Sequence, residues 1–147
     1  RENNIRGILF DIDNTLEPYA TEIPGERTLN LFEELRFIGI QTAIISNNHK
    51  ERVEKFASPL NVDFYYDSLK PRTDNIFAAI NKMGINKHEV IIIGDQLFTD
   101  IWAGYRAGIK SMFVNKLSDD ESLFIRTKRL LEIPFVKRIR KCGYGKL

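Results

Sequence analysis

The chain has 147 residues, of which 43% are hydrophobic and 29% charged, proportions typical of a soluble globular protein that forms one domain. Cys142 is the single cysteine, which excludes an internal disulfide and fits a reducing compartment, and no apolar run approaches the roughly 20 residues of a membrane-spanning helix. The net charge of +2 is unevenly divided: residues 1–125 carry 14 basic and 19 acidic side chains, whereas residues 126–147 carry 8 and 1. We therefore expect a mildly acidic domain over residues 1–125 and a strongly basic tail over residues 126–147.

Short apolar runs alternate with helical segments along the chain, a pattern typical of a parallel sheet built from βαβ units. The expected strands cover residues 5–11, 41–46, 64–66, 90–93 and 111–114. The expected helices cover residues 26–38, 49–57, 73–83 and 98–107, and three of them end at Gly39, Gly84 and Gly108. In the first helix, the face expected to be buried carries Leu29, Leu31, Phe32 and Leu35. The sequence predicts a three-layer, Rossmann-like α/β sandwich around a five-stranded parallel sheet.

Polar clusters follow four of these strands. Asp11-Ile12-Asp13-Asn14-Thr15 follows the first strand, Ser46-Asn47-Asn48 the second, and Lys70-Pro71 the third, while Asp95 and Asp100 follow the fourth. Ligands of open α/β sheets bind beyond the carboxyl ends of the strands, so we expect the four carboxylates of the first and last clusters to converge on one rim. That much negative charge in one cleft is costly unless a cation neutralises it.

In this order, the clusters resemble the four motifs of the haloacid dehalogenase superfamily of phosphohydrolases, over residues 5–115. The wording Ser46-Asn47-Asn48, Lys70-Pro71 and Gly94-Asp95-Gln96-Leu97-Phe98-Thr99-Asp100 is similar to that of the YqeG-type branch, which includes the mitochondrial phosphatidylglycerophosphate phosphatases. The resemblance implies a phosphatase fold. Many members carry a cap domain, but the intervals from Asp11 to Ser46 and from Ser46 to Lys70 are too short for one, so we expect an open site without a cap.

The resemblance also implies a role for each matching residue in the first and fourth motifs. Asp11 would be the nucleophile that forms an aspartyl-phosphate, and Asp13 would be the general acid and base. Thr15 would orient the loop that carries them. Mg²⁺ would be held by Asp11, Asp95 and the main-chain carbonyl of Asp13. Asp100 would support the site through a hydrogen bond to a metal-bound water or to Lys70.

Positive charge and hydrogen-bond donors are needed where a phosphoryl group is transferred. The resemblance implies that Lys70 supplies the charge and that Ser46 and the backbone beside Asn47 supply donors. Each site residue also has a local explanation, namely capping of turns and helix ends by Asp, Ser, Asn and Thr, or a solvated surface position for lysine. His49 and His88 lack partners at metal-ligand spacing, so we expect both to be surface residues.

An open site suits a substrate with its own bulk: a protein, a nucleic-acid end or a lipid headgroup. In the tail, Arg126–Leu147, basic and apolar residues alternate, which favours peripheral contact with an anionic membrane. A helix packed on the domain with a solvated basic face, or a nucleic-acid patch, are the alternatives.

We expect a Mg²⁺-dependent phosphomonoesterase of phosphatidylglycerophosphate or a similar anionic lipid phosphate, with no nucleic-acid partner. It would be cytoplasmic, peripheral at the inner membrane face, or in the mitochondrial matrix if the source is eukaryotic. The alternatives are a phosphatase of a soluble or macromolecular phosphate, or a catalytically silent phosphate-binding scaffold.

Overall fold

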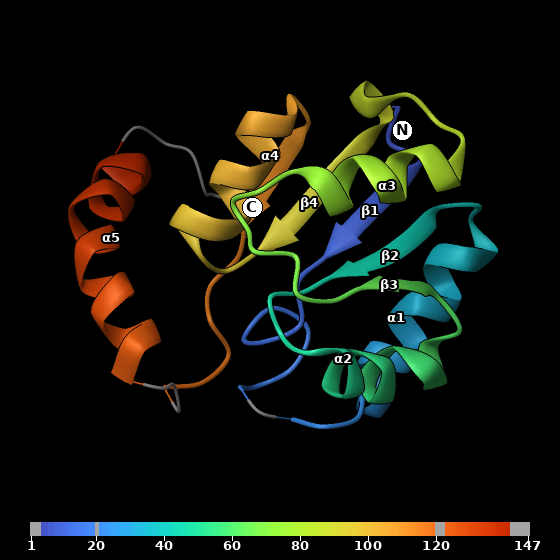
Figure 1. Cartoon of the computed structure of the whole chain (residues 1–147), viewed down its shortest axis with the longest axis horizontal. Coiled ribbons are helices and arrows are strands. Elements are labelled where there is room, and N and C mark those ends of the chain that lie inside the picture. The colour runs from blue at the N-terminus through green and yellow to red at the C-terminus, as the bar shows by residue number, and fades with distance from the viewer. Residues whose placement is uncertain (1–3, 20, 120–122, 142–147) are drawn as a thin grey trace.

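The protein has five parallel strands in the order β3-β2-β1-β4-β5, seen in a computed structural model that describes residues 4–19, 21–119 and 123–141 (Figure 1). The strands are β1 (Gly7–Phe10), β2 (Gln41–Ile45), β3 (Asp63–Tyr65), β4 (Val90–Gly94) and β5 (Lys110–Phe113). The helices are α1 (Glu26–Phe37), α2 (Lys50–Ala57), α3 (Asp74–Met83), α4 (Trp102–Ala107) and α5 (Leu123–Lys141). Their order confirms the predicted βαβ alternation.

The sheet has an apolar core on each face, because successive side chains of a strand point to opposite sides. On β1, Leu9 belongs to the cluster formed with α3 and α4, which includes Ile76. Its neighbour Phe10 belongs to the cluster formed with α1 and α2, where its ring lies 5.1 Å from that of Phe32. Figure 1 shows α3 and α1 on opposite sides of the sheet. The predicted three-layer sandwich is therefore confirmed.

The predicted ends of three helices agree with the structure better than the predicted buried face of the first helix does. Gly39, Gly84 and Gly108 all have left-handed backbone, with φ of +79°, +65° and +68°. Gly84 and Gly108 directly follow α3 and α4, and Gly39 follows α1 after one residue, Ile38. The predicted burial of Leu31 is wrong, because its side chain is exposed. Helical residues turn by about 100° each, so Phe32 faces the sheet with Leu29 and Leu35, and Leu31 points away.

The segment after β4 departs from the predicted α-helix. A π-helical turn, η3 (Leu97–Ile101), precedes α4. The wider turn brings the side chain of Asp100 back onto Gly94, at the end of β4, where a Cβ atom would lie 2.3 Å from Asp100 Cγ. π-helical turns are frequent at functional sites, and here the turn together with Gly94 places a carboxylate beside the end of the sheet.

The basic tail forms most of α5, which lies beside α4 in Figure 1. The predicted boundary at residue 125 falls inside this helix, since α5 begins at Leu123. Residues 142–147 lie outside the described part of the chain, as do the α5 side chains at positions 123, 124, 128, 129 and 137–141. Within the described residues, no helix combines the length and apolar character needed to cross a membrane.

One face of α5 packs on η3. The Phe98 main-chain N–H donates to Glu132 Oε1 at 2.9 Å, and the rings of Phe98 and Phe135 meet edge to face at 5.6 Å. Glu132 is buried. The sequence allows a helix packed on the domain as one alternative for the tail. At this contact α5 is such a packed helix, and it touches the turn that carries Asp100.

Candidate active site

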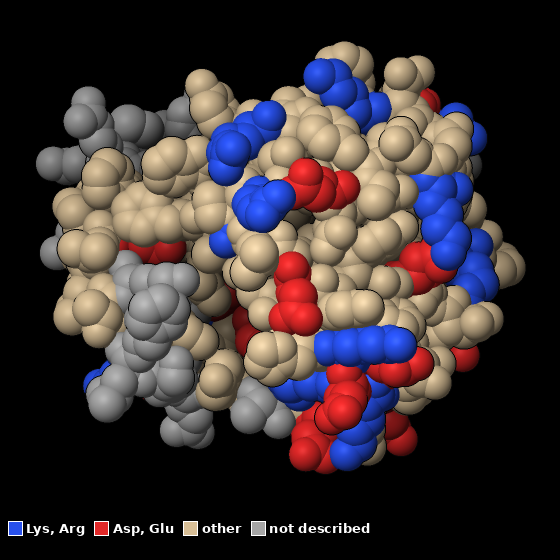
Figure 2. All heavy atoms as spheres, viewed as in Figure 1, with Lys and Arg blue, Asp and Glu red and all other residues tan. Residues whose placement is uncertain are grey.

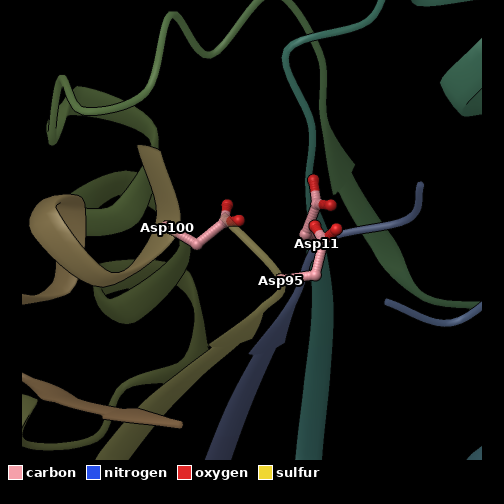
Figure 3. Close-up of side chains that lie close together, drawn as sticks. All are labelled: Asp11, Asp95 and Asp100. Carbon is pink, nitrogen blue, oxygen red and sulfur yellow. The ribbon is translucent and has the colours of Figure 1, made fainter. Parts of the chain in front are cut away.

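Three carboxylates meet where β1 and β4 end. Asp11 follows β1 directly, Asp95 follows β4, and Asp100 comes from η3. One oxygen from each lies within 4.8 Å of the others, and Figure 3 shows Asp11 and Asp95 side by side with Asp100 directed toward them. All three residues are buried, with exposed fractions of 7%, 0% and 1%. The predicted convergence of these carboxylates on one rim is observed.

Lys70 reaches the same cluster from the loop after β3. Its Nζ donates to Asp11 Oδ1 and to Asp100 Oδ1, each at 2.6 Å, and to the main-chain oxygen of Ile45 at 2.9 Å. The side chain is only 2% exposed, so it is not a solvated surface lysine. An ammonium group has three N–H donors, and these three contacts use all of them. A phosphate oxygen can therefore bind Lys70 only by taking the place of one of these acceptors.

Burial and charge change the protonation of both members of this pair. Burial raises the pKa of Asp11 well above its ordinary value; Lys70 opposes that rise, and the charges of Asp100 and Asp95 add to it. Burial lowers the pKa of Lys70, but the charges of Asp100 and Asp11 outweigh burial, so the pKa lies above its usual value. The two carboxylates thus favour the charged form of Lys70.

The charge of the cluster fits a bound divalent cation. Three carboxylates and one ammonium leave two negative charges when all are ionised, which one divalent ion balances. Asp100 already has a donor for each oxygen, because Oδ1 accepts from Lys70 and Oδ2 accepts from the Gln96 main-chain N–H at 3.1 Å. The three carboxylates offer an all-oxygen donor set, which suits a hard ion.

Hydroxyl groups lie beside the cluster at the two predicted positions. Thr15 Oγ1 lies 3.5 Å from Asp11 Oδ2 and 3.4 Å from Asp95 Oδ1, so its single O–H links the two carboxylates loosely. Ser46 is buried at the end of β2, and its Oγ accepts the Asn48 main-chain N–H at 3.1 Å. That arrangement leaves the Ser46 O–H available as a donor.

The side chain of Asn47 is hydrogen-bonded to the backbone of Lys70. Its Oδ1 accepts the main-chain N–H of Lys70 at 2.7 Å, and its Nδ2 donates to the main-chain oxygen of Lys70 at 3.3 Å. Both ends of the amide are therefore engaged by the backbone of the lysine. The side chain of Asn47 thus holds the backbone of Lys70 in place, while the role of the main-chain groups beside Asn47 as phosphate donors stays a prediction.

Asp13 is held by Asn48, which belongs to the second polar cluster, and by Arg52, which lies outside all the predicted motifs. Asn48 Nδ2 donates to its Oδ2, and Arg52, on the first turn of α2, donates from Nη2 to its Oδ1. The two contacts span 35 and 39 residues along the chain. From sequence alone, a charged residue near the start of a helix is expected to be a solvated side chain. The only sequence feature that could have indicated the Arg52 contact is that α2 begins at the same edge of the sheet as the loop of Asp13.

The described segments beside the site contain no additional folded unit. Between β1 and α1, residues 11–19 and 21–25 form turns and one isolated bridge, between Asp13 and Glu17. Between β2 and Lys70 the chain forms α2, a short 3₁₀ turn (Ser58–Leu60) and β3. His49 is exposed and pairs with Asp67 at 3.0 Å. In the described residues, these elements fill both intervals, and neither interval holds a further folded unit.

Comparison with known proteins gives the family. The family model described as haloacid dehalogenase-like hydrolase matches residues 21–114. "Probable phosphatase YqeG" of Bacillus subtilis is 32% identical over 98% of this chain and 84% of its own length. "Phosphatidylglycerophosphate phosphatase 1, chloroplastic/mitochondrial" of Arabidopsis thaliana is 28% identical over 97% of this chain, which spans 44% of that protein.

Solved structures give the same fold at low sequence identity. The cobalt-bound deoxy-D-mannose-octulosonate 8-phosphate phosphatase of Haemophilus influenzae superposes with a TM-score of 0.62 at 17% identity, covering 86% of this chain and 75% of that one. A phosphatase from Thermococcus onnurineus superposes with a TM-score of 0.63 at 15% identity, covering 81% and 90%. The extent of the family match, together with the relative at 32% identity, shows that this chain belongs to the haloacid dehalogenase-like hydrolases and is a phosphatase of that family.

Proposed function

We propose that the protein hydrolyses phosphate monoesters through a phosphorylated Asp11. The observation that supports this proposal most directly is the arrangement around Asp11, which lies beyond the end of β1 with Lys70 on Oδ1 and Asp95 beside it. A buried carboxylate next to a cation and a second carboxylate is suited to attack phosphorus, because the cation offsets the charge of the incoming phosphoryl group. Splitting hydrolysis into two displacements replaces one difficult step by two easier ones.

In the first displacement, an oxygen of Asp11 attacks phosphorus and the bond to the leaving oxygen breaks. The leaving oxygen takes a proton from Asp13, which becomes a carboxylate. In the second, Asp13 removes a proton from a water molecule as that water attacks the phosphorus of the aspartyl-phosphate. Inorganic phosphate leaves, and Asp11 and Asp13 return to their starting states. One group serves both steps because the proton moves in opposite directions.

Lys70 and Ser46 would stabilise the charge that spreads over the transferred phosphoryl oxygens. As phosphorus bonds to Asp11, that carboxylate loses its negative charge, which ends on the leaving oxygen and is neutralised there by the proton from Asp13. The Lys70 ammonium donates to Asp11 Oδ1 before the reaction. It can then direct that N–H to a phosphoryl oxygen while its hydrogen bonds to Asp100 and to the Ile45 main-chain oxygen remain. Asn47 and Asp100 would hold Lys70 in place during this exchange.

We infer that the cation is Mg²⁺, held by Asp11, Asp95 and the main-chain carbonyl of Asp13. When bound, the ion supplies charge neutralisation at the attacking and phosphoryl oxygens. Thr15, between the two ligating carboxylates, would keep their spacing.

The proposed substrate is an anionic lipid phosphate such as phosphatidylglycerophosphate, with the protein bound peripherally at the membrane. Two observations support it. The Arabidopsis relative carries that activity in its name, and the outer surface of α5 leaves Leu130 and Leu131 65% and 64% exposed within a basic sequence. On the face that Figure 2 shows, acidic and basic side chains of the body lie close together, so this face does not carry a single sign of charge. The basic residues of the tail sequence, Arg126–Leu147, are therefore the ones proposed to meet anionic lipid.

A turnover assay tests the chemistry. The purified protein should hydrolyse para-nitrophenyl phosphate with Mg²⁺, and Asp11→Asn should abolish turnover because an amide does not attack phosphorus. The variant should keep the circular dichroism spectrum of the parent. Substantial turnover by Asp11→Asn would exclude Asp11 as the nucleophile, and no turnover by the parent on any phosphate would favour a silent scaffold.

Vesicles of phosphatidylglycerol that carry phosphatidylglycerophosphate test the substrate. The Leu130→Ser, Leu131→Ser double variant should lose vesicle binding and lipid turnover, and keep turnover of para-nitrophenyl phosphate. Phe37→Ser is the matched control, since Phe37 is 93% exposed at the end of α1 and should be dispensable. Salt should weaken the binding of the parent, because exposed charges are screened over about 8–10 Å. Faster turnover of a soluble phosphate than of the lipid would favour the soluble-substrate alternative.

A further inference from the structure

Asp13 is anchored from outside its own motif. Arg52 donates from Nη2 to Asp13 Oδ1 and from Nη1 to the main-chain oxygen of Thr21 at 2.8 Å. Asn48 donates from Nδ2 to Asp13 Oδ2. Both oxygens of this carboxylate therefore have donors on the segment that follows β2, and the loop that contains Asp13 and Thr21 is attached to α2 by one guanidinium group.

The Arg52 contact is more enclosed than the other ion pair formed by α2 at the same place. The side chains of Arg52 and Asp13 are 24% and 14% exposed, whereas those of Lys55 and Glu22, one turn further along α2, are 55% and 69% exposed. A planar guanidinium fixed at two points loses little further freedom when it binds a carboxylate. The pair with Asp13 is thus a defined geometry, while the Lys55 pair is a solvated surface contact.

We propose that Arg52 is a positioning residue for proton transfer by Asp13. Its guanidinium holds Oδ1 in place, and Oδ2 is the oxygen that exchanges the proton with the leaving group and then with water. The proposal rests on the proposed function, since it requires Asp13 to be the proton carrier.

The chemistry of the two donors separates their roles. Arginine has N–H donors only and remains charged, so it offers no acceptor for a proton carried on Oδ1. The side-chain amide of Asn48 has both a carbonyl and an NH₂ group, and a half-turn about its last bond replaces the donor by an acceptor. Arg52 is therefore suited to be the constant anchor of Asp13, and Asn48 the partner that adapts when Oδ2 gains or loses a proton.

The experiment compares two substrates that differ in their need for an acid. The leaving group of para-nitrophenyl phosphate departs without a proton, whereas that of an alkyl phosphate requires one. The ratio of kcat/KM for the two substrates is measured with Mg²⁺ for the parent, Arg52→Gln, Arg52→Lys, Asp13→Asn and Lys55→Gln. Because both substrates are assayed on one preparation, the ratio is insensitive to the fraction of each variant that is folded.

Arg52→Gln should lose roughly 10–100-fold in kcat/KM on the alkyl phosphate and about threefold or less on para-nitrophenyl phosphate, because misplacing the acid affects only the leaving group that needs it. Arg52→Lys should fall between Arg52→Gln and the parent. Lys55→Gln, which removes a positive charge from the same pocket of about 360 Å³, should match the parent on both substrates.

Equal losses of Arg52→Gln on both substrates, or parental activity on the alkyl phosphate, would overturn the role of Arg52. Asp13→Asn separates that failure from a failure of the proposed function. It should show a larger loss on the alkyl phosphate than Arg52→Gln, with the same dependence on the leaving group. If Asp13→Asn shows no such dependence, Asp13 is not the acid, and the inference falls with it.

Discussion

Replacing Lys70 by methionine removes the cation that two buried carboxylates share. The side chains of Lys70, Asp11 and Asp100 are 2%, 10% and 1% exposed, so water cannot easily solvate what remains. We expect the metal-free variant to be much less stable than the metal-free parent, since methionine fills a similar volume but carries no charge.

The size of the effect follows from the two contacts of 2.6 Å. At an effective dielectric constant of about 20, each contact corresponds to about 6 kcal/mol of Coulomb attraction. The cost of burying the charges offsets most of this attraction. Removing one partner of a buried ion pair typically lowers the free energy of unfolding by about 3–5 kcal/mol. For a chain of this length, the unfolding midpoint should fall by roughly 10–15 °C.

Thermal and urea unfolding in excess chelator measure the loss, and Lys82→Met is the matched control. Lys82 Nζ also lies 2.6 Å from a carboxylate, that of Asp63, but the two side chains are 63% and 44% exposed. Exposed pairs contribute about 0–1 kcal/mol, so this control should change the midpoint little. A loss below about 1 kcal/mol for Lys70→Met, or equal losses in both variants, would refute the reasoning from burial.

The variant should also recover stability in mild acid. Burial raises the pKa of Asp11, and the loss of Lys70 removes the interaction that lowers it. A carboxyl group whose pKa is raised in the folded state loses stability as pH rises from its unfolded-state pKa through its folded-state pKa. Lowering the pH from about 7 to about 5 should therefore restore part of the free energy of unfolding, as Asp11 takes up a proton. A further loss on acidification would contradict this sign.

Three more predictions concern the metal, the glycine before Asp95 and the C-terminal helix. Chelation should abolish turnover and Mg²⁺ restore it, whereas Ca²⁺ should inhibit, because it prefers more ligands and looser geometry; full activity in excess chelator would contradict a metal site. Gly94→Ala should lose activity and about 1–3 kcal/mol of stability, since the new Cβ would meet Asp100, and unchanged kinetics would exclude that contact. Glu132→Ala should cost about 1–3 kcal/mol in urea unfolding by leaving the Phe98 N–H without this acceptor, while Glu132→Gln should cost less; no change in either variant would show that α5 does not support η3.

Local patterns accounted for the fold and for the residues at the ends of strands. The apolar runs predicted the five strands, and left-handed glycines ended three helices as expected. Strands that are parallel place their carboxyl ends at one edge, so Asp11, Asp95 and Lys70 could be brought together in the prediction without coordinates. Periodicity was less reliable for side-chain burial, as the exposed Leu31 shows, because Leu31 lies about 100° around the helix from Phe32 and falls off the buried face.

Contacts between distant segments could not be derived from such patterns. Three examples of such contacts lie in the described part of the chain. Arg52 pairs with Asp13, 39 positions away, and Asn47 binds the backbone of Lys70, 23 positions away. Glu132 accepts a hydrogen bond from Phe98, 34 positions away. Each depends on the direction of a side chain after the layers have packed, and no local spacing records that direction.

The sequence by itself determined the order of elements, the absence of room for a cap and the chemical types at the rim, because backbone preferences and hydrophobic patterning act over short distances. Only the tertiary structure decided which oxygen meets which donor. It replaced the first turn of the predicted helix after β4 by a π-helical turn that seats Asp100 on Gly94, and it used all three donors of Lys70. These details follow from close packing, in which a side chain takes the one position that satisfies its burial and its hydrogen bonds together.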